Sequence, residues 1–253
     1  KTSVPIYLKS GFSRLSGLHH WFALLSREAS SLLIGPPQPV NLLGMTDPPN
    51  RCVIEKTSDV DLLGALWENF SHENSILSLR RTAEFWRWRY LDHPVFNYQI
   101  LYAAALDTFA VVRVEEVRSD GDVIRVLRIV ELVVGKQGEN ATTMSEAVTE
   151  FLQTLLLEKL EAGVDAIDFR VSNEIFDEAM SQSGFSLMAF GELRTGFPGF
   201  AGQLNPLRLR PSPINLHWKT AKGLAGGGSV LHFTKSDSDM DRPNVRGVRS
   251  KKL

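Results

Sequence analysis

Apolar and polar positions follow two different periods along this chain, and the change from one to the other predicts the order of its elements. Alternating or continuous β-branched runs indicate strands, and apolar residues three or four apart indicate helices. Strands are expected at 51–57, 97–105, 108–117, 123–134, 164–172 and 185–197, and helices at 59–70, 82–92, 144–163 and 173–184. The order βααβββαβαβ predicts an α/β domain with a mixed sheet flanked by helices.

Several boundaries carry signals of their own. Asp120-Gly121 predicts a hairpin between two strands. Pro94 ends the second helix, because proline cannot continue it. The helix at 144–163 is the most regular, and its apolar side chains recur at helical spacing: Val148, Phe151, Leu152, Leu155 and Leu156. The run at 123–134 is apolar enough for a central strand buried on both faces.

The rest of the chain divides around this domain. Residues 35–50 form a linker rich in proline and glycine, and the main domain spans 51–245. A basic tail follows at 246–253. Residues 1–34 contain strand-like runs, and because the chain begins with Lys1 rather than methionine, we expect it to be a piece of a longer chain.

Composition narrows the class of partner. Hydrophobic residues make up 43% and charged residues 23% of the 253, as in an ordinary globular protein. The net charge of −1 gives no reason to expect nucleic acid or an anionic membrane. No apolar run reaches the roughly 18 residues of a membrane span. The single cysteine, Cys52, is expected to be a small core residue and fits a reducing compartment, so we expect a cytoplasmic protein.

Metal chemistry has little support. Asp237, Asp239 and Asp241 begin like a calcium loop, but the glycine and the later glutamate of such a loop are missing. His19-His20 and His93 lack the companions of a metal site, so no metal is expected. The acidic segment is either a solvated tail or an attraction for a cationic amine. The preceding run at 230–233 is expected to pair beside the strand after the last helix.

The element order resembles that of the GNAT superfamily of acyl-CoA-dependent N-acyltransferases. Gly184-Phe185, after the helix that opens at Asn173, resembles the "N…GF" close of that family. The text "FWRWRYLDHP" with Tyr98 soon after, and the tail "FTKSDSDMDRP", resemble a bacterial subgroup linked to polysaccharide biosynthesis. The resemblance covers about 51–245, and residues 1–34 would then be the closing strands of a preceding similar unit.

The resemblance implies acetyl-CoA as co-substrate, with its pyrophosphate on backbone N–H groups at the start of the long helix. The implied cofactor-binding residues follow the central strand and precede the last helix: Val133, Val134, Gly135, Lys136, Gly138, Asn140, Thr142, Thr143 and Asn173. Glu139 is placed where it would repel phosphate, and an ordinary strand-to-helix loop would look the same.

The resemblance also implies a general base on the central strand, and Glu131 occupies that place. Burial in an apolar strand would disfavour its charged form. The structural alternative is an ion pair with Arg125 or Arg128. Met180 stands where the family often has a tyrosine acid, and a methionine cannot donate a proton.

Aromatic residues of the "WRWRY" run have two interpretations. Trp86 and Tyr90 share one helical face, which is typical of a core. Alternatively, the helix and the acidic tail border the acceptor cleft. The candidate substrate-binding residues are then Trp88, Arg89, Tyr90, Asp92, Asp237 and Asp239.

We therefore expect an N-acetyltransferase that acts on a small amine, such as an amino sugar in glycan biosynthesis. Two alternatives stay open: an inactive GNAT-like binding or scaffold domain, and a relative that uses aminoacyl-tRNA, against which the near-neutral charge argues. The expected partners are a small-molecule amine and either a second copy of the chain or a second such unit in a longer one.

Overall fold

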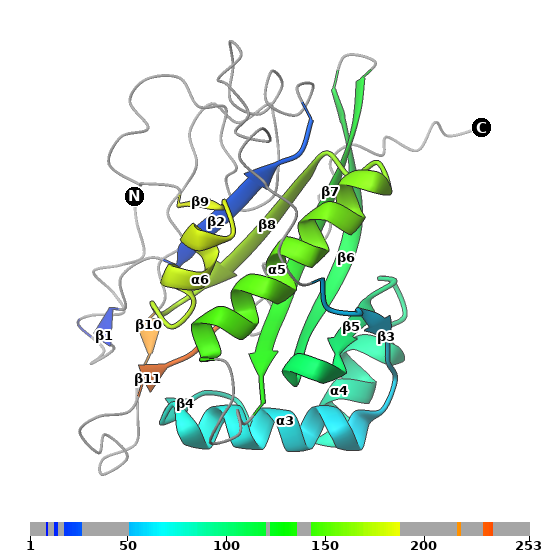
Figure 1. Cartoon of the computed structure of the whole chain (residues 1–253). Helices are drawn as coiled ribbons and strands as arrows, with labels where there is room; N and C mark the ends of the chain where they lie inside the picture. Colours follow the sequence, from blue (N-terminus) through cyan, green and yellow to red (C-terminus); the bar gives the residue numbers. More distant parts are fainter. Residues whose placement is uncertain are drawn as a thin grey trace.

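A mixed sheet organises this chain (Figure 1). The computed structural model describes residues 9, 13–14, 18–26, 51–119, 122–135, 143–187, 217–218 and 230–234. In this part of the chain, seven strands form one sheet in the order β3-β5-β6-β7-β8-β2-β9. Their bounds are Glu55–Lys56 (β3), Gln99–Ala103 (β5), Thr108–Ser119 (β6), Asp122–Val134 (β7), Ala166–Val171 (β8), His19–Leu24 (β2) and Ser186–Leu187 (β9).

One neighbouring pair in this sheet is parallel, and the others are antiparallel. Neighbouring strands from β3 to β7 are antiparallel, β7 and β8 are parallel, and β2 is antiparallel to both β8 and β9. The β6–β7 hairpin closes at the pair Ser119↔Asp122, as the Asp120-Gly121 signal predicts. The mixed α/β fold and its predicted order from 51 to 187 are confirmed.

Three of the four α-helices in the described residues begin at a side-chain cap. The helices are Val60–Glu73 (α3), Ala83–Trp86 (α4), Met144–Glu161 (α5) and Asp177–Gln182 (α6), with a π-helix at Arg87–Leu91 (η2) and a 3-10 turn at Ala104–Leu106 (η3). Asp59, Thr82 and Thr143 accept hydrogen bonds from backbone N–H groups in the first turns of α3, α4 and α5. These are the residue types that satisfy the unpaired donors of a helix start.

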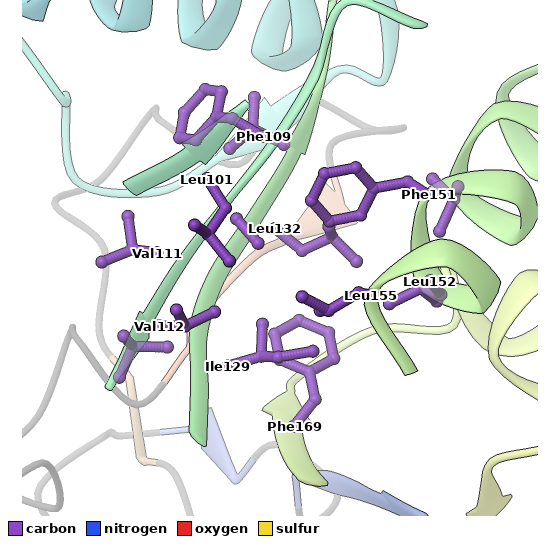
Figure 2. Packing of buried hydrophobic residues seen from close by; sticks show 14 of the residues in the cluster. Leu101, Phe109, Val111, Val112, Ile129, Leu132, Phe151, Leu152, Leu155 and Phe169 are labelled. Atoms are coloured by element: carbon purple, nitrogen blue, oxygen red, sulfur yellow. The ribbon is translucent and has the colours of Figure 1, made fainter. Parts of the chain in front are cut away.

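Helix α5 covers one face of the sheet (Figure 1). Its side chains Phe151, Leu152 and Leu155 are completely buried and lie toward Ile129 and Phe169 (Figure 2). The apolar stripe predicted for this helix is therefore its core face. Strand β7 is buried on both faces from Val126 to Val134, as its apolar composition predicts.

Strands β2 and β11 (Val230–Leu231), from the two ends of the described chain, pair with strands that the sequence pattern did not indicate as their partners. Strand β2 pairs with β8 over its whole length and fills the place between β8 and β9. The expectation that residues 230–233 pair beside the strand after the last helix is therefore wrong, because β2 occupies that place. Strand β11 (Val230–Leu231) instead pairs in parallel with β4 (Ile76–Leu77), which follows α3.

A further two-stranded pair joins β1 (Ser13–Arg14) to β10 (His217–Trp218) in antiparallel fashion. None of the helices within the described ranges combines the length and the apolar composition that crossing a membrane requires.

Close packing at the end of β7 requires a glycine. A Cβ atom on Gly135 would lie 2.5 Å from Leu66 Cδ2 and 2.9 Å from Asp107 Cβ. We expect Gly135→Ala to lower the free energy of unfolding by about 1–3 kcal/mol through overpacking, as measured by urea unfolding.

Gly64 provides the matched control. It lies inside α3, and a Cβ there would meet no atom closer than Ala83 N at 3.7 Å. Gly64→Ala should raise the free energy of unfolding by up to about 1 kcal/mol, because alanine is the better helix former. Equal effects of the two substitutions would contradict the packing explanation.

Candidate functional site

The two parallel central strands separate halfway along their length. Strands β7 and β8 pair only from Val126↔Ala166 to Ile129↔Phe169. Beyond these pairs β7 stays with β6 as far as Val134, while β8 stays with β2 as far as Val171. Past Ile129, the edge of β7 that faces β8 is therefore no longer paired with it. We call this place the β7–β8 opening.

A β-bulge lies at the start of the opening. Val112 pairs with Ile129 and Val111 pairs with Glu131, so Val130 is the extra residue on β7. An extra residue reverses the alternation of side chains along a strand. Arg128 and Glu131 consequently lie on the same face of the sheet, opposite the face that α5 covers.

Glu131 is the centre of a buried polar group at this bulge. Its side chain is 0% exposed, and its Oε1 accepts hydrogen bonds from Arg81 Nε at 2.9 Å and from Tyr90 Oη at 3.0 Å. The guanidinium of Arg81 lies 4.1 Å from the ring centroid of Trp67. It also donates to Ser78 Oγ at 2.8 Å and to the Leu79 carbonyl at 3.0 Å. Glu131 is therefore held in one orientation by an ion pair and a phenol.

The ion pair that the sequence suggested for Glu131 has a different partner. Arg128 binds Glu115 and Asp168 instead. Arg125 donates to the carbonyls of Ala162 and Gly163 at the end of α5. No sequence signal singled out Arg81, whose only mark is its place directly before the helix cap Thr82.

The "WRWRY" run divides between the core and the surface. Trp86 and Tyr90 are 0% and 1% exposed and stack at 5.6 Å, so the core interpretation of this face is confirmed. Trp88 is 69% exposed, and Asp92 is also exposed. The π-helix, closed by the Asp92 N–H on the Arg87 carbonyl at 2.8 Å, brings Tyr90 to Glu131. π-Turns of this kind are frequent at functional sites.

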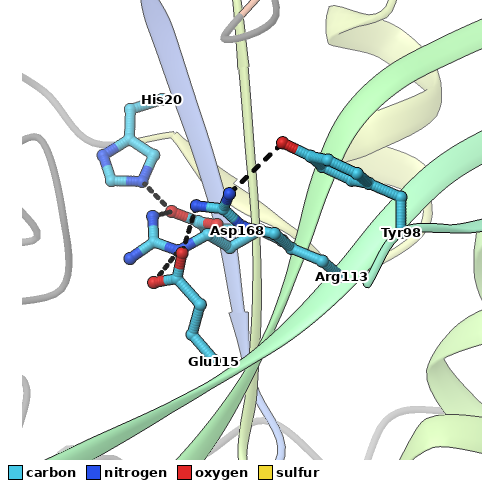
Figure 3. A network of polar contacts seen from close by, with 6 residues as sticks. His20, Tyr98, Arg113, Glu115 and Asp168 are labelled. Carbon is cyan, nitrogen blue, oxygen red and sulfur yellow. Dashed lines mark hydrogen bonds and ion pairs between the residues drawn. The ribbon is translucent and has the colours of Figure 1, made fainter. Parts of the chain in front are cut away.

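A second polar network continues along the same sheet face (Figure 3). Arg113 contacts the Tyr98 hydroxyl at 3.3 Å and forms an ion pair with Glu115. Arg128 joins Glu115 at 2.6 Å to Asp168 at 3.2 Å. The Tyr98 and Tyr90 rings are 5.1 Å apart. The two polar groups are therefore adjacent.

His20 ends this network on β2. Arg170 Nη2 lies 3.1 Å from His20 Nδ1. Because arginine only donates, Nδ1 accepts, and the proton of a neutral ring is on Nε2, 3.4 Å from Asp168 Oδ2. Burial lowers the pKa of Arg170 to about 10. His19 lies on the other face, 3.0 Å from Asp177.

The segment 230–234 lies along β8 where β7 leaves it. Ser172 donates its N–H to the Phe233 carbonyl at 2.9 Å, and Thr234 forms a bridge with Val171. Since β2 already occupies the other edge of β8, this segment lies on the side of the opening. Asn173 donates to the Leu231 carbonyl at 3.1 Å and contacts His232 Nδ1 at 3.0 Å. Asn173, predicted to bind cofactor, thus contacts the segment 230–234.

Helix α5 begins with a capping box. Thr143 Oγ1 accepts from the Glu146 N–H at 3.2 Å, and Glu146 Oε2 accepts from the Thr143 N–H at 2.7 Å. The latter bond holds the pKa of Glu146 below its usual value. Within the described ranges, Ser145 Oγ in the first turn is buried without a hydrogen-bond partner.

Several predicted site residues lie outside the described residues: Lys136, Gly138, Asn140, Thr142, Asp237 and Asp239. Val133 and Val134 are buried on β7 beside the opening, and Gly135 ends that strand. Their roles in cofactor binding stay predictions.

Cys52 and Met180 do not have the properties of catalytic residues. Cys52 is buried against Thr154 Oγ1 at 3.5 Å, and burial raises the pKa of its thiol. It is a core residue, as expected. Met180 is fully buried in α6 and cannot donate a proton. Among the described residues, no three histidine, cysteine or acidic side chains are grouped so as to hold a metal ion.

Comparison with known proteins finds likeness only at the level of structure. No family model matches the chain. No curated protein matches it either. Similar solved structures include a GCN5-related N-acetyltransferase from Anabaena variabilis ATCC 29413, with 14% identity and a TM-score of 0.47 over 75% of this chain and 42% of that one.

Another similar structure is the N-myristoyltransferase of Saccharomyces cerevisiae with bound myristoyl-CoA, with 10% identity and a TM-score of 0.48 over 68% of this chain and 46% of that one. The chain spans less than half the length of either neighbour. The fold class itself follows from the strand and helix order of this chain: a mixed α/β fold with a seven-stranded sheet in the described residues, flanked by helices.

Proposed function

We propose that this chain is an acyl-CoA-dependent N-acyltransferase that transfers an acetyl group to a small amine. The observation that carries the proposal is the β7–β8 opening. At its start, a bulge at Val130 places the buried carboxylate of Glu131 on the sheet face opposite α5. The open strand edge suits an extended ligand with amide groups, and the carboxylate suits proton transfer from an amine.

The direction of the backbone groups on β7 beside the opening follows from its pairing with β6. Gly135 donates its N–H to the Asp107 carbonyl of the β6 side at 2.6 Å. Because backbone groups of an antiparallel pair alternate in direction, the N–H groups of Val133 and Glu131 also turn toward β6. Those of Leu132 and Val134 turn toward the opening, where the pantetheine amides of acyl-CoA would bind.

The phosphates of the same ligand would lie at the start of α5. Its first backbone N–H groups and its dipole favour an anion there. Ser145 Oγ, buried without a partner in the described part of the chain, adds a donor at this end. We keep Lys136, Gly138, Asn140, Thr142 and Thr143 as the predicted phosphate-binding segment.

Transfer requires a neutral amine to attack the thioester carbonyl. Glu131 is the group proposed to receive the proton of the amine, with Arg81 and Tyr90 holding its carboxylate in place. An amino sugar is the proposed acceptor, with Trp88, Arg89 and Asp92 beside it and Asp237 and Asp239 attracting its ammonium group.

Amide hydrogen exchange followed by NMR tests the proposal. With acetyl-CoA at about 100 times its Kd, exchange at Leu132 and Val134 should slow by roughly 100-fold. The amides of Glu131 and Val133, already turned toward β6, are the internal control and should change little. Binding that leaves Leu132 and Val134 unprotected would contradict the proposed site.

A catalytically inactive binding module is the second candidate. It is favoured by the occupation of the β8 edge by 233–234 and by the buried Met180 where an acid is expected. Absence of acetyl-CoA binding at millimolar concentration would favour this module over the acyltransferase.

A further inference from the structure

His232 is a buried polar residue of the segment that lies on the side of the β7–β8 opening. Its side chain is wholly buried among aromatic rings, with centroid distances of 5.7 Å to Trp67, 5.7 Å to Phe70 and 6.4 Å to Phe176. Its Nδ1 contacts Asn173. Its Nε2 has no hydrogen-bond partner in the part of the chain that the structure describes.

The tautomer of this histidine follows from its neighbour. Asn173 Oδ1 accepts from the Ile175 N–H at 3.3 Å, which distinguishes the oxygen of that amide from its nitrogen. Asn173 Nδ2 then donates one hydrogen to the Leu231 carbonyl at 3.1 Å and the other to His232 Nδ1 at 3.0 Å. Nδ1 is therefore an acceptor, and the ring proton is on Nε2.

The ring stays neutral in this environment. Burial, and secondarily the positive charge of Arg81, lower the pKa of His232 to about 3. A neutral imidazole can donate a hydrogen bond, but it would have to become an imidazolate to give up its proton. A role as proton donor to a leaving group is thereby disfavoured, and a role as hydrogen-bond donor is favoured.

The His232 ring has neighbours from both sides of the β7–β8 opening. Its backbone N–H donates to the Leu77 carbonyl at 3.1 Å, and its side chain is held by Asn173 directly after β8. Trp67 and Phe70 belong to α3, which packs against β7. Arg81, the cation that acts on His232, is also the partner of Glu131.

An unsatisfied buried donor is rare in a folded protein, because the group has lost its water without gaining another acceptor. Such donors are used in enzymes to stabilise negative charge that develops on an oxygen in the transition state. The β7–β8 opening is where the proposed function puts a thioester carbonyl.

We propose that the Nε2–H of His232 donates a hydrogen bond to the acyl carbonyl oxygen of the bound thioester. This inference rests on the proposed acyltransferase function. The amine nitrogen forms a bond to the carbonyl carbon, and the carbonyl π electrons move to the oxygen that faces His232. When the carbonyl reforms, the carbon–sulfur bond breaks and its electron pair leaves with CoA. The amine proton passes to Glu131 and then to the thiolate, while His232 keeps its own proton.

NMR of the chain labelled with ¹⁵N-histidine gives the first test. Titration with acetyl-CoA should move the Nε2–H proton of His232 downfield, as a new hydrogen bond requires. Free CoA is the matched ligand, because it differs from acetyl-CoA only in having a thiol in place of the acetyl thioester that contains the acyl carbonyl. It should bind without that shift.

Variants give the second test, with the amine acceptor that supports turnover. His232→Phe keeps a ring but removes the donor, and should lower kcat roughly 100-fold with little change in KM. His232→Gln, which retains an N–H at similar reach, should recover part of the loss. A merely structural role would instead change KM or folding without this rescue.

The outcomes separate this inference from the function on which it rests. Acetyl-CoA binding with no shift at His232, or with the same shift for free CoA, would overturn the role of His232 and leave the acyltransferase proposal standing. Failure of both ligands to bind would overturn the proposed function, and this inference with it.

Discussion

Glu131→Gln is expected to lower the free energy of unfolding by about 3–5 kcal/mol, although the change removes only one charge. Arg81 and Glu131 are both 0% exposed at the side chain, and their nitrogen and oxygen lie 2.9 Å apart. The substitution would remove the Glu131 charge from beside the buried Arg81 guanidinium. Burial of an unpaired charge is among the costliest single changes in a protein.

Urea unfolding of the parent chain and three variants would measure this effect. The double variant Arg81→Met with Glu131→Leu should be far more stable than the single variant, since it removes both charges. Glu68→Gln breaks the Arg80–Glu68 pair, whose side chains are 79% and 64% exposed, and should cost less than about 1 kcal/mol. A single variant as stable as the parent would contradict the buried pair.

Acidification from pH 7 to pH 5 is expected to remove about 2 kcal/mol of stability through His232 alone. Its pKa is lowered to about 3 in the folded chain by burial and by Arg81, against about 6.5 in an unfolded chain. Between these values the unfolded chain binds the proton and the folded chain does not. The stability that this group contributes is therefore complete above about pH 6.5 and is lost as the pH falls toward 3.

Urea unfolding of the parent chain and of His232→Gln at pH 7 and pH 5 would test this. The parent should lose about 2 kcal/mol more than the variant over this interval. His72→Gln, at an exposed position on α3, is the control and should follow the parent. Parallel loss in the parent and in His232→Gln would show that His232 is not the group responsible.

The effects of Glu131→Gln and of the His232 variants on catalysis have to be separated from their effects on stability. Glu131→Gln, studied where it remains folded, should retain acetyl-CoA binding and lose turnover if Glu131 accepts the amine proton. The amides of Leu132 and Val134 would then report binding independently of catalysis.

Much of the candidate site was visible in local patterns. Glu131 stood out because it is the one acid in the apolar part of β7, and Thr143 because it directly precedes the long helix. Both signals depend on neighbours close in the sequence. Tyr90 was assigned both to the core and to the site, and it contributes to both, since its ring stacks on Trp86 while its hydroxyl meets Glu131.

The partners of these residues had no such signal. Arg81 reaches Glu131 across 50 positions, and His232 reaches Asn173 across 59. The bulge at Val130 depends on the register between β6 and β7, and no residue type in this stretch announces it. Asp168 and Glu115 looked like ordinary strand positions, and Arg128 was one candidate for an ion pair with Glu131. Only their alignment across neighbouring strands joins these three residues into a network.

Periodicity, caps and turns are short-range properties, because the backbone geometry of a helix or a strand decides which nearby side chains share a face. The amino-acid sequence therefore specified the order of elements from 51 to 187, the core stripe of α5 and the position of Glu131 on β7. The tertiary structure alone decided that β2 enters between β8 and β9, that β7 and β8 separate, and that Arg81 reaches Glu131 and His232 reaches Asn173. Strand order and burial decide which distant residues come into contact. Both are set only when segments far apart in the sequence pair in one sheet and are buried together.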